Sequence, residues 1–270
     1  MCIRDRPRAA YRSFFAWDLL TPPRYVGVAH YQALVASGEL ASTLGRSLRY
    51  SVVVVLASLC LGLFLALQLN RPGRIYAFVR SAIFSAYIVS WVSVALLWMW
   101  LLDAEMGFVS RTIAALGLGK HDWLGNPKLS LYALAGVSVW KITGYAMVIF
   151  LAGLQDIPQS VLEAANLDGA SRIQRFRYVI WPLLAPTTTF VATTSMILSF
   201  QAFDVVRVMT QGGPVRSTTV FVYAIYEHVF VNLRVGRASA MTVAFFAVLL
   251  LLTLFQLWTF RRAARGRVAT

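Results

Sequence analysis

Five long apolar blocks dominate the chain, and short polar links separate them. A helix needs roughly 20 apolar residues to cross the hydrocarbon core of a bilayer, and irregular backbone is too costly there. The pattern therefore predicts an all-α, polytopic membrane protein with about five transmembrane helices. The expected helices are residues 48–70, 79–102, 129–154, 182–206 and 237–260, with the fourth starting at Pro182.

Charges inside the apolar stretches are few and therefore informative. A sixth stretch, residues 217–232, is short and contains Glu227 and His228, which favours an interfacial or re-entrant helix over a span. The third block contains Lys141. A lysine at the bilayer centre is costly unless it faces protein or water, so this helix is expected to line a cavity or to lie inside the bundle. The competing interpretation is a lysine that snorkels along its own helix or is held by a carbonyl.

Composition supports the membrane interpretation. Of the 270 residues, 59% are hydrophobic and 13% are charged, and the net charge is +14. The basic residues lie at the ends of the apolar blocks, where they meet lipid headgroups, and they form no polar face of the kind that binds nucleic acid. Cys2 and Cys60 are too few for a disulfide framework or a metal site.

Arginines in three links suggest the topology. They lie in residues 70–80, in residues 155–181 and after residue 260 (Arg71, Arg74, Arg80, Arg172, Arg175, Arg177, Arg261, Arg262, Arg265 and Arg267). Placing these links in the cytoplasm follows the positive-inside tendency. The expected cytoplasmic segments hold more basic residues per unit length than the outer segments, although the outer segments hold more in total. We therefore expect residues 1–45 outside the membrane, a transmembrane domain over residues 46–262 and a cytoplasmic basic tail over residues 263–270.

An odd number of helices then starts the chain on the outer side. Residues 1–49 contain no apolar run that would carry the chain across. The favoured interpretation is a chain that lacks a preceding helix, and the alternative is the opposite orientation.

The link over residues 155–181 holds the strongest local signals. Ile157-Pro158 is a turn with proline at a helix entry, residues 160–166 favour helix, and Asp168-Gly169 is a C-cap signal before a second short helix. Small side chains at Ala164 and Ala165 permit close docking of another protein. The alternative is an ordinary polar connection between two spans.

This link resembles a known motif. The spacing Glu163-Ala164-Ala165-x3-Gly169-x12-Pro182 is similar to the EAA loop of permease subunits in bacterial ABC importers. Gly144-Tyr145, residues 150–158, residues 199–204 and Gly212-Gly213-Pro214 further resemble the maltose-type carbohydrate permeases, specifically the first of the two paired subunits. The family's isoleucine–x–leucine–proline is here Val179-Ile180-Trp181-Pro182, an apolar change that is expected to preserve docking.

The resemblance implies a MetI-like helical bundle in the bacterial inner membrane. Its partners would be a second permease, two ABC ATPases and an extracytoplasmic solute-binding protein, and its solute a carbohydrate or a related molecule. The residues implied to couple it to the ATPase are Glu163, Ala164, Ala165, Asp168, Gly169 and Pro182. Glu163 would pair with a basic residue of the ATPase, and Gly169 would make the turn between the two helices of the loop.

A solute pathway is expected along the third and fourth helices. The candidate residues, partly from depth and partly from the resemblance, are Lys141, Tyr145, Ser195, Leu198, Ser199, Gln201 and Ala202. Ser195 and Ser199 lie one turn apart and could offer hydroxyls to a sugar, but small residues equally serve helix–helix packing. Gln201 and Asp204 could form gate contacts or a solvated helix end.

The expected activity is transport and not catalysis. The chain has no G-x-x-x-x-G-K-[ST] loop, no G-x-S-x-G elbow and no ligand spacing among His30, His121 and His228. No cofactor is expected in this chain, and ATP would be used by the partner subunits. The alternative is an ion-coupled transporter of a small polar solute, which would want acidic residues within the spans.

Overall fold

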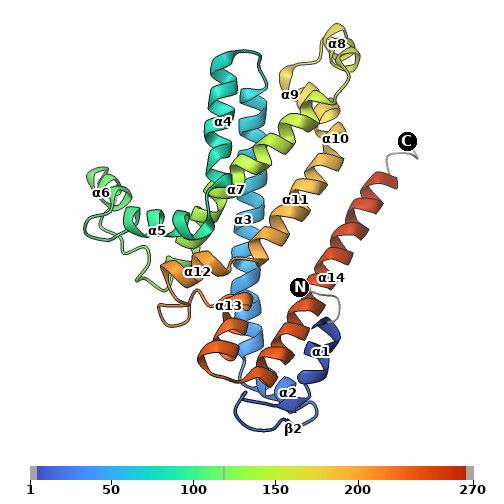
Figure 1. Cartoon of the computed structure of the whole chain (residues 1–270). Helices are drawn as coiled ribbons and strands as arrows, with labels where there is room; N and C mark the ends of the chain where they lie inside the picture. The colour runs from blue at the N-terminus through green and yellow to red at the C-terminus, as the bar shows by residue number, and fades with distance from the viewer. Residues whose placement is uncertain (1–4, 118, 266–270) are drawn as a thin grey trace.

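The computed structural model describes residues 5–117 and 119–265, and the fold that it shows is almost entirely helical (Figure 1). Among these residues, three unbroken helices are long and apolar enough to cross a membrane: α3 (Glu39–Leu69), α7 (Ser130–Gln155) and α14 (Val235–Arg265). Two bent helix pairs each pass the same test together. The expected all-α polytopic architecture is confirmed.

The remaining elements are short. In chain order they are α1 (Asp5–Arg12), β1 (Phe15–Ala16), β2 (Arg24–Tyr25), α2 (Ala29–Ala36), α4 (Arg74–Ile88), α5 (Trp91–Leu101), α6 (Phe108–Ala115), α8 (Gln159–Leu167), α9 (Arg172–Arg175), η1 (Phe176–Ile180), α10 (Trp181–Leu183), α11 (Ala185–Phe200), α12 (Phe203–Met209), α13 (Phe221–Tyr226) and η2 (Glu227–Val231). The two strands pair antiparallel, with Phe15 opposite Tyr25.

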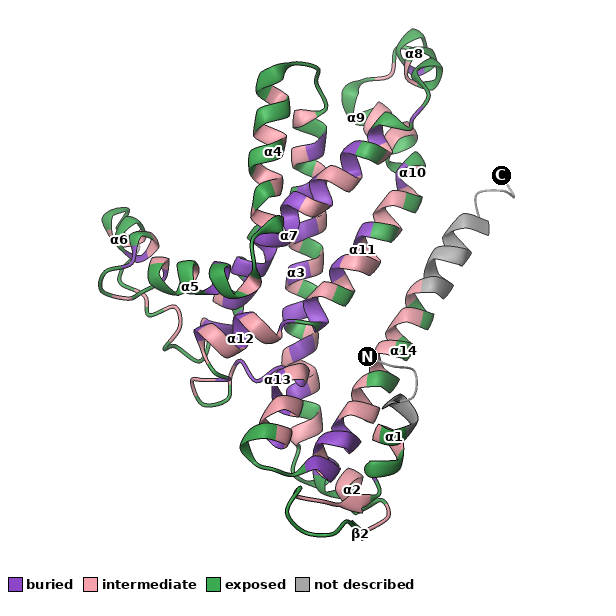
Figure 2. Cartoon of the chain, viewed as in Figure 1, coloured by how far each residue is buried: buried purple, intermediate pink, exposed green. Residues whose placement is uncertain are grey.

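Helix α7 is the centre of the bundle. Its apolar window is 72% buried, against 22% for α3 and α14, and it packs on α3, α4 and α11 (Figure 2). Glycines allow this closeness, because a Cβ at Gly144 would lie 2.5 Å from the carbonyl oxygen of Ile83, and one at Gly62 would lie 2.7 Å from Cβ of Ala146. In a membrane the hydrophobic effect does not drive helices together, because lipid tails are as apolar as the side chains. Small residues at the contacts allow close backbone packing, which supplies van der Waals attraction instead.

Hydroxyl pairs join the same helices. Tyr50 and Ser138 link α3 to α7 with an oxygen–oxygen distance of 2.5 Å, and Ser51 and Ser199 link α3 to α11 at 2.6 Å. All four side chains are buried. Paired hydroxyls remove the cost of burying each alone.

The second predicted helix, over residues 79–102, is broken in the structure. Helices α4 and α5 meet at 101°, because Val89 and Ser90 both have extended backbone. The fourth predicted helix, over residues 182–206, is also interrupted. A helical stretch from Arg172 to Leu183 bends by 67° into α11, whose first turn holds Pro186. Proline donates no backbone hydrogen bond, which accounts for a bend there, and Gln201 and Ala202 then separate α11 from α12.

The two ends of the bundle differ in content. The α3–α4 turn, α8 and the end of α14 lie at one end, and β2, α2 and the start of α14 lie at the other (Figure 1). The arginine-bearing links therefore share one end as far as they are described, whereas Arg267 and the rest of the expected tail after Arg265 lie outside the described residues. At the opposite end, the predicted short stretch over residues 217–232 forms α13 and η2. Its buried Phe221 stacks on Phe245 of α14, and its buried Tyr223 lies against Phe203 of α12.

Glu39 connects four segments at that opposite end. Its carboxylate accepts hydrogen bonds from Arg237 of α14 at 2.7 Å, His228 of η2 at 3.1 Å and Arg216 of the preceding loop at 3.2 Å. Arg216 also bonds Glu227 at 3.2 Å. One acidic side chain at the start of α3 thereby fixes the positions of α14, η2 and the 212–219 loop.

We expect the substitution Glu39→Ala to lower the stability of the purified protein by about 2 kcal/mol, because it leaves partly buried cations without their carboxylate. Thermal unfolding in detergent measures this, with Glu105→Ala as control, since Glu105 is exposed and its side chain pairs with no described residue. Equal melting temperatures for the two variants would contradict the anchoring role.

Candidate functional site

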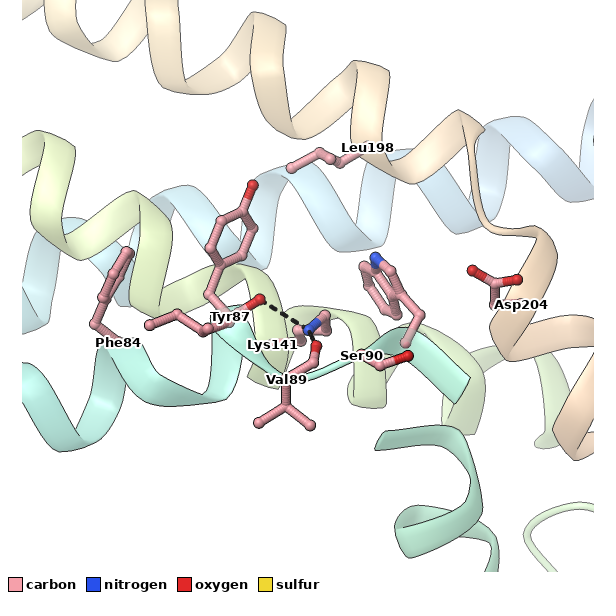
Figure 3. A pocket seen from close by; sticks show the side chains of 9 residues that line it. Phe84, Tyr87, Val89, Ser90, Lys141, Leu198 and Asp204 are labelled. Atoms are coloured by element: carbon pink, nitrogen blue, oxygen red, sulfur yellow. Dashed lines mark hydrogen bonds between the residues drawn. The ribbon is translucent and has the colours of Figure 1, made fainter. Parts of the chain in front are cut away.

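A cavity of about 560 Å³ opens where α4 breaks into α5. Aromatic and apolar side chains dominate its wall, with a few polar groups among them (Phe84, Tyr87, Ile88, Val89, Ser90, Trp91, Lys141, Leu198 and Asp204). Figure 3 shows Leu198 and Asp204 approaching from α11 and α12, opposite the α4–α5 break. A mostly apolar wall with a few placed polar groups is typical of small-molecule sites.

Lys141 holds the break in place from α7. Its ammonium donates to the carbonyl oxygens of Tyr87 at 2.9 Å and Ala86 at 3.2 Å, and also to that of Val89 (Figure 3). These carbonyls belong to the end of α4, where the helix no longer supplies donors. The side chain is 1% exposed, so its charge is stabilised by backbone and not by water.

Aromatic rings surround the same ammonium. Nζ of Lys141 lies 5.0 Å from the ring centre of Trp91 and 5.8 Å from that of Tyr87, distances at which a cation is attracted to a ring face. Tyr87 stacks on Tyr145, with ring centres 5.0 Å apart. The rings thus stabilise the lysine and also form one side of the cavity.

The predicted pathway residues divide into two groups. Lys141 and Leu198 line the cavity, and Tyr145 is not on its wall but stacks on Tyr87, which is. Ser195, Ser199 and Ala202 do not line the cavity; all three are buried within the bundle, and Gln201 is exposed.

The two serines therefore offer no hydroxyl to the cavity in this conformation. Ser199 bonds Ser51 across the α3–α11 contact, and it also donates to the carbonyl oxygen of Met196 at 2.8 Å. Ser195 is fully buried, with no hydrogen-bond partner among the described atoms. Ser199 thus takes part in a helix contact, and the expected role of both serines on a solute pathway stays a prediction.

Most of the wall residues were missing from the predicted pathway. Phe84, Tyr87 and Trp91 recur at intervals of three and four, a spacing that is visible in the sequence and would share one face of an unbroken helix. In the structure Phe84 and Tyr87 lie on α4, and Trp91 begins α5. Ser90 could not be foreseen, because it faces the cavity only through the break. Asp204 was weighed as a gate or a solvated helix end, and it lines the cavity.

The link over residues 155–181 forms an exposed helical hairpin at the end of the bundle (Figure 2). Helix α8 ends in a Schellman arrangement: Ala170 N donates to Ala165 O and Gly169 N to Asn166 O, both at 3.1 Å. Gly169 has φ +72°, a conformation that favours glycine. The predicted turn between two short helices is thus present in the structure.

Side-chain bonds then fix the second helix of the hairpin. Ser171 and Gln174 form a reciprocal capping box at the start of α9. Arg175 donates to Oδ1 of Asn166 at 2.6 Å, which ties α9 back to α8. The hairpin is therefore one connected unit between α7 and the α10–α11 helices, and Pro182 lies within α10.

The outer surface of the hairpin is apolar at several positions. Leu167 is 89% exposed, Ile173 79% and Tyr178 70%, and Glu163 and Ala164 are exposed beside them. Ala165 faces inward. Clustered exposed apolar side chains mark contact surfaces for other proteins.

Among the described residues, no group of three or more His, Cys, Asp or Glu side chains could hold a metal ion.

A helical membrane bundle with an internal cavity and an exposed coupling-type hairpin defines a transport permease. The chain matches the family model described as the binding-protein-dependent transport system inner membrane component over residues 58–265. The chain belongs to this family, and the resemblance carried by Glu163, Gly169 and Pro182 is confirmed: it is an inner-membrane permease subunit of an ABC importer.

Known relatives support the assignment over nearly the whole chain. The chain is 33% identical over 260 residues to a probable ABC transporter permease of Pyrococcus horikoshii, covering 94% of this chain and 89% of that one. It is 33% identical over 251 residues to the sn-glycerol-3-phosphate transport system permease protein UgpA of Agrobacterium fabrum, covering 92% and 85%. Its fold is similar to that of a bacterial ABC transporter involved in the import of the acidic polysaccharide alginate, with a TM-score of 0.82, 22% identity and coverage of 96% and 90%.

We expect Lys141→Met to destabilise the bundle by about 3 kcal/mol, because it removes the donor shared by three carbonyl oxygens at the end of α4. Thermal unfolding of the purified protein measures the loss. Lys128→Met is the matched control, since Lys128 is exposed just before α7. A Lys141→Met variant as stable as the control would show that the break does not depend on the lysine.

Proposed function

We propose that this chain forms one half of the membrane channel of an ABC importer for carbohydrates or related polyols. The relatives UgpA and the sulfoquinovosyl glycerol permease SmoG of Agrobacterium fabrum carry such solutes in their names. A second permease would close the channel, two ABC ATPases would bind below it, and an extracytoplasmic binding protein would deliver the solute. ATP would be hydrolysed in those partner subunits.

The exposed hairpin α8–α9 is the observation that carries the coupling proposal. It projects Glu163, Ala164 and Leu167 away from the bundle, so these side chains are free to enter a groove on another protein. Glu163 would pair there with a basic side chain, which fixes the register of docking. Asp168 and Gly169 would preserve the angle between the two short helices.

Movement of the hairpin would reach the cavity along two routes. Helix α7, which precedes α8, carries Lys141, and α11, which follows α10, carries Leu198. ATPase closure that displaces α8 would therefore shift two walls of the cavity at once, the rigid-body form of alternating access.

The wall of the cavity suits a hydroxyl-rich solute. The charge of Lys141 is taken up by backbone carbonyls, which leaves Asp204 and Ser90 as polar groups beside the rings of Tyr87 and Trp91. Carboxylate and hydroxyl oxygens accept hydrogen bonds from sugar hydroxyls, and ring faces cover the apolar side of a sugar.

The proposed orientation places α8 in the cytoplasm. A single cysteine at Ala164, in a chain whose native Cys2 and Cys60 are replaced by serine, should react with a membrane-impermeant maleimide in inside-out vesicles and stay unlabelled in intact cells. A cysteine at Thr21, at the other end of the bundle, is the matched control with the opposite pattern. Labelling of Ala164→Cys from outside the cell would overturn the orientation.

The coupling role predicts that Glu163→Lys leaves the transporter assembled but lowers solute-stimulated ATPase activity at least tenfold, because two like charges then meet at the docking groove. Activity of the reconstituted complex, with its binding protein and solute, measures this. Glu105→Lys, an exposed charge reversal at α5–α6, should retain activity. Full stimulated activity of Glu163→Lys would count against coupling through α8, and uptake driven by a proton gradient without ATP would favour the ion-coupled alternative.

A further inference from the structure

A second cavity, of about 410 Å³, lies between the N-terminal segment and the start of α14, at the end of the bundle opposite α8. It exists because residues 15–17 dock closely on α14. The backbone N–H of Val235 donates to Trp17 O at 2.9 Å, and Nε2 of His30 lies 3.1 Å from Phe15 O. A Cβ at Gly236 would lie 2.0 Å from that same oxygen, so only glycine permits this approach.

Two arginines on the wall of this cavity are exposed, and their side chains have no partner within the described part of the chain. The guanidinium groups of Arg24 and Arg234 form no hydrogen bond or ion pair with any described residue. The third arginine, Arg237, is held by Glu39. The adjacent start of α14 adds the partial positive charge of a helix N-terminus.

The acidic residue on the wall is committed to its own turn. Oδ1 of Asp18 accepts hydrogen bonds from the Thr21 hydroxyl at 2.7 Å, from Thr21 N at 2.8 Å and from Leu20 N at 3.1 Å. These bonds, the one from Thr21 N first, lower the pKa of Asp18. Asp18 therefore stays ionised and shapes the loop, and its single negative charge leaves the wall net positive through Arg24 and Arg234.

An aromatic cavity of about 270 Å³ adjoins it and shares Trp17 as a wall. Its other walls are Tyr11, Arg12, Phe15 and Pro23, and the Arg12 guanidinium lies 4.8 Å from the Trp17 ring centre. A cavity rich in arginine and a mainly aromatic one therefore share Trp17 as a wall. The combination fits an amphiphile, with an anionic group on one side of Trp17 and an apolar part on the other.

The position of the cavities identifies the class of amphiphile. Helix α14 is only 22% buried over its apolar window, so this chain leaves most of its apolar surface uncovered, and α1 packs along it (Figure 1). The second cavity lies where α14, a helix long and apolar enough to span a membrane, begins, and Trp, Tyr and Arg are side chains that occur at the headgroup level of membranes. Arginine also recognises phosphate oxygens in a bidentate manner.

We propose that this cavity binds the phosphate of a membrane glycerophospholipid through Arg24 and Arg234, with the glycerol and upper acyl region against Trp17 and Tyr11. The bound lipid would fasten the N-terminal segment to α14. The site is separate from the solute pathway, and its proposal does not rest on the proposed function.

Native mass spectrometry of the complete transporter, released from nanodiscs of phosphatidylethanolamine and phosphatidylglycerol, tests this directly. Wild type should retain a phospholipid adduct under conditions that strip bulk lipid. Arg24→Gln with Arg234→Gln should lower its occupancy at least tenfold, and each single variant should lower it partly. Arg111→Gln, an exposed arginine on α6, should retain it. Diacylglycerol, which has the same chains and no phosphate, should not bind.

Three results would overturn the proposal. One is an adduct of equal occupancy in the double variant. Another is full displacement of the lipid by millimolar inorganic phosphate, which would indicate a site for free anions. The third is a double variant that keeps the lipid adduct but loses the stimulation of ATPase activity by the binding protein. That result would assign the two arginines to contact with an acidic protein surface. If the double variant fails to assemble, the wild-type transporter is labelled with a photoreactive phosphatidylethanolamine. The proposal requires the label at residues 11–25 or 234–237, and labelling only elsewhere would overturn it.

Discussion

A buried ammonium and an interrupted helix satisfy each other at the centre of this protein. Lys141 on α7 would be costly in a membrane without partners, and so would the unpaired carbonyl oxygens at the end of α4. Three hydrogen bonds between them remove both costs. The chain can therefore turn by 101° inside the bundle, an arrangement that an uncharged α7 would not support.

The cavity follows from that turn. A straight helix over residues 79–102 would run past α7 and leave no space, whereas the turn directs α5 across the bundle and exposes Ser90 and Trp91 to the opening. The rings of Tyr87 and Trp91 that attract the ammonium also form part of the wall. The charge of Lys141 is already balanced by these rings and by the carbonyl oxygens, so it is not available to a solute. What remains for a solute is aromatic surface with Asp204 and a few hydroxyls.

The sequence predicted most of the fold because hydropathy reports the length and apolar content of helices. It located both ends of α7, the C-terminal end of α3 and the start of α14 within about two residues, but it began α3 too late. The spacing of Glu163, Gly169 and Pro182 located the hairpin. It did not predict the break at Val89-Ser90, because neither proline nor glycine marks it and its cause, Lys141, lies about 50 residues away in the chain. Nor could it orient Ser195 and Ser199, since small polar residues serve both helix contacts and pathways.

The two ends of the bundle differ in how firmly their segments are joined to the rest of the structure. At one end, α8 and α9 are joined to each other by side-chain bonds but expose most of their surface, so the hairpin can move as a unit with whatever binds it. At the other end, Glu39 ties α3, η2, α14 and the 212–219 loop together. A displacement applied to α8 would then bend or rotate α7 and α11 against a fixed base. The largest change would occur between those ends, at the depth of the Lys141 break, where the walls of the cavity meet.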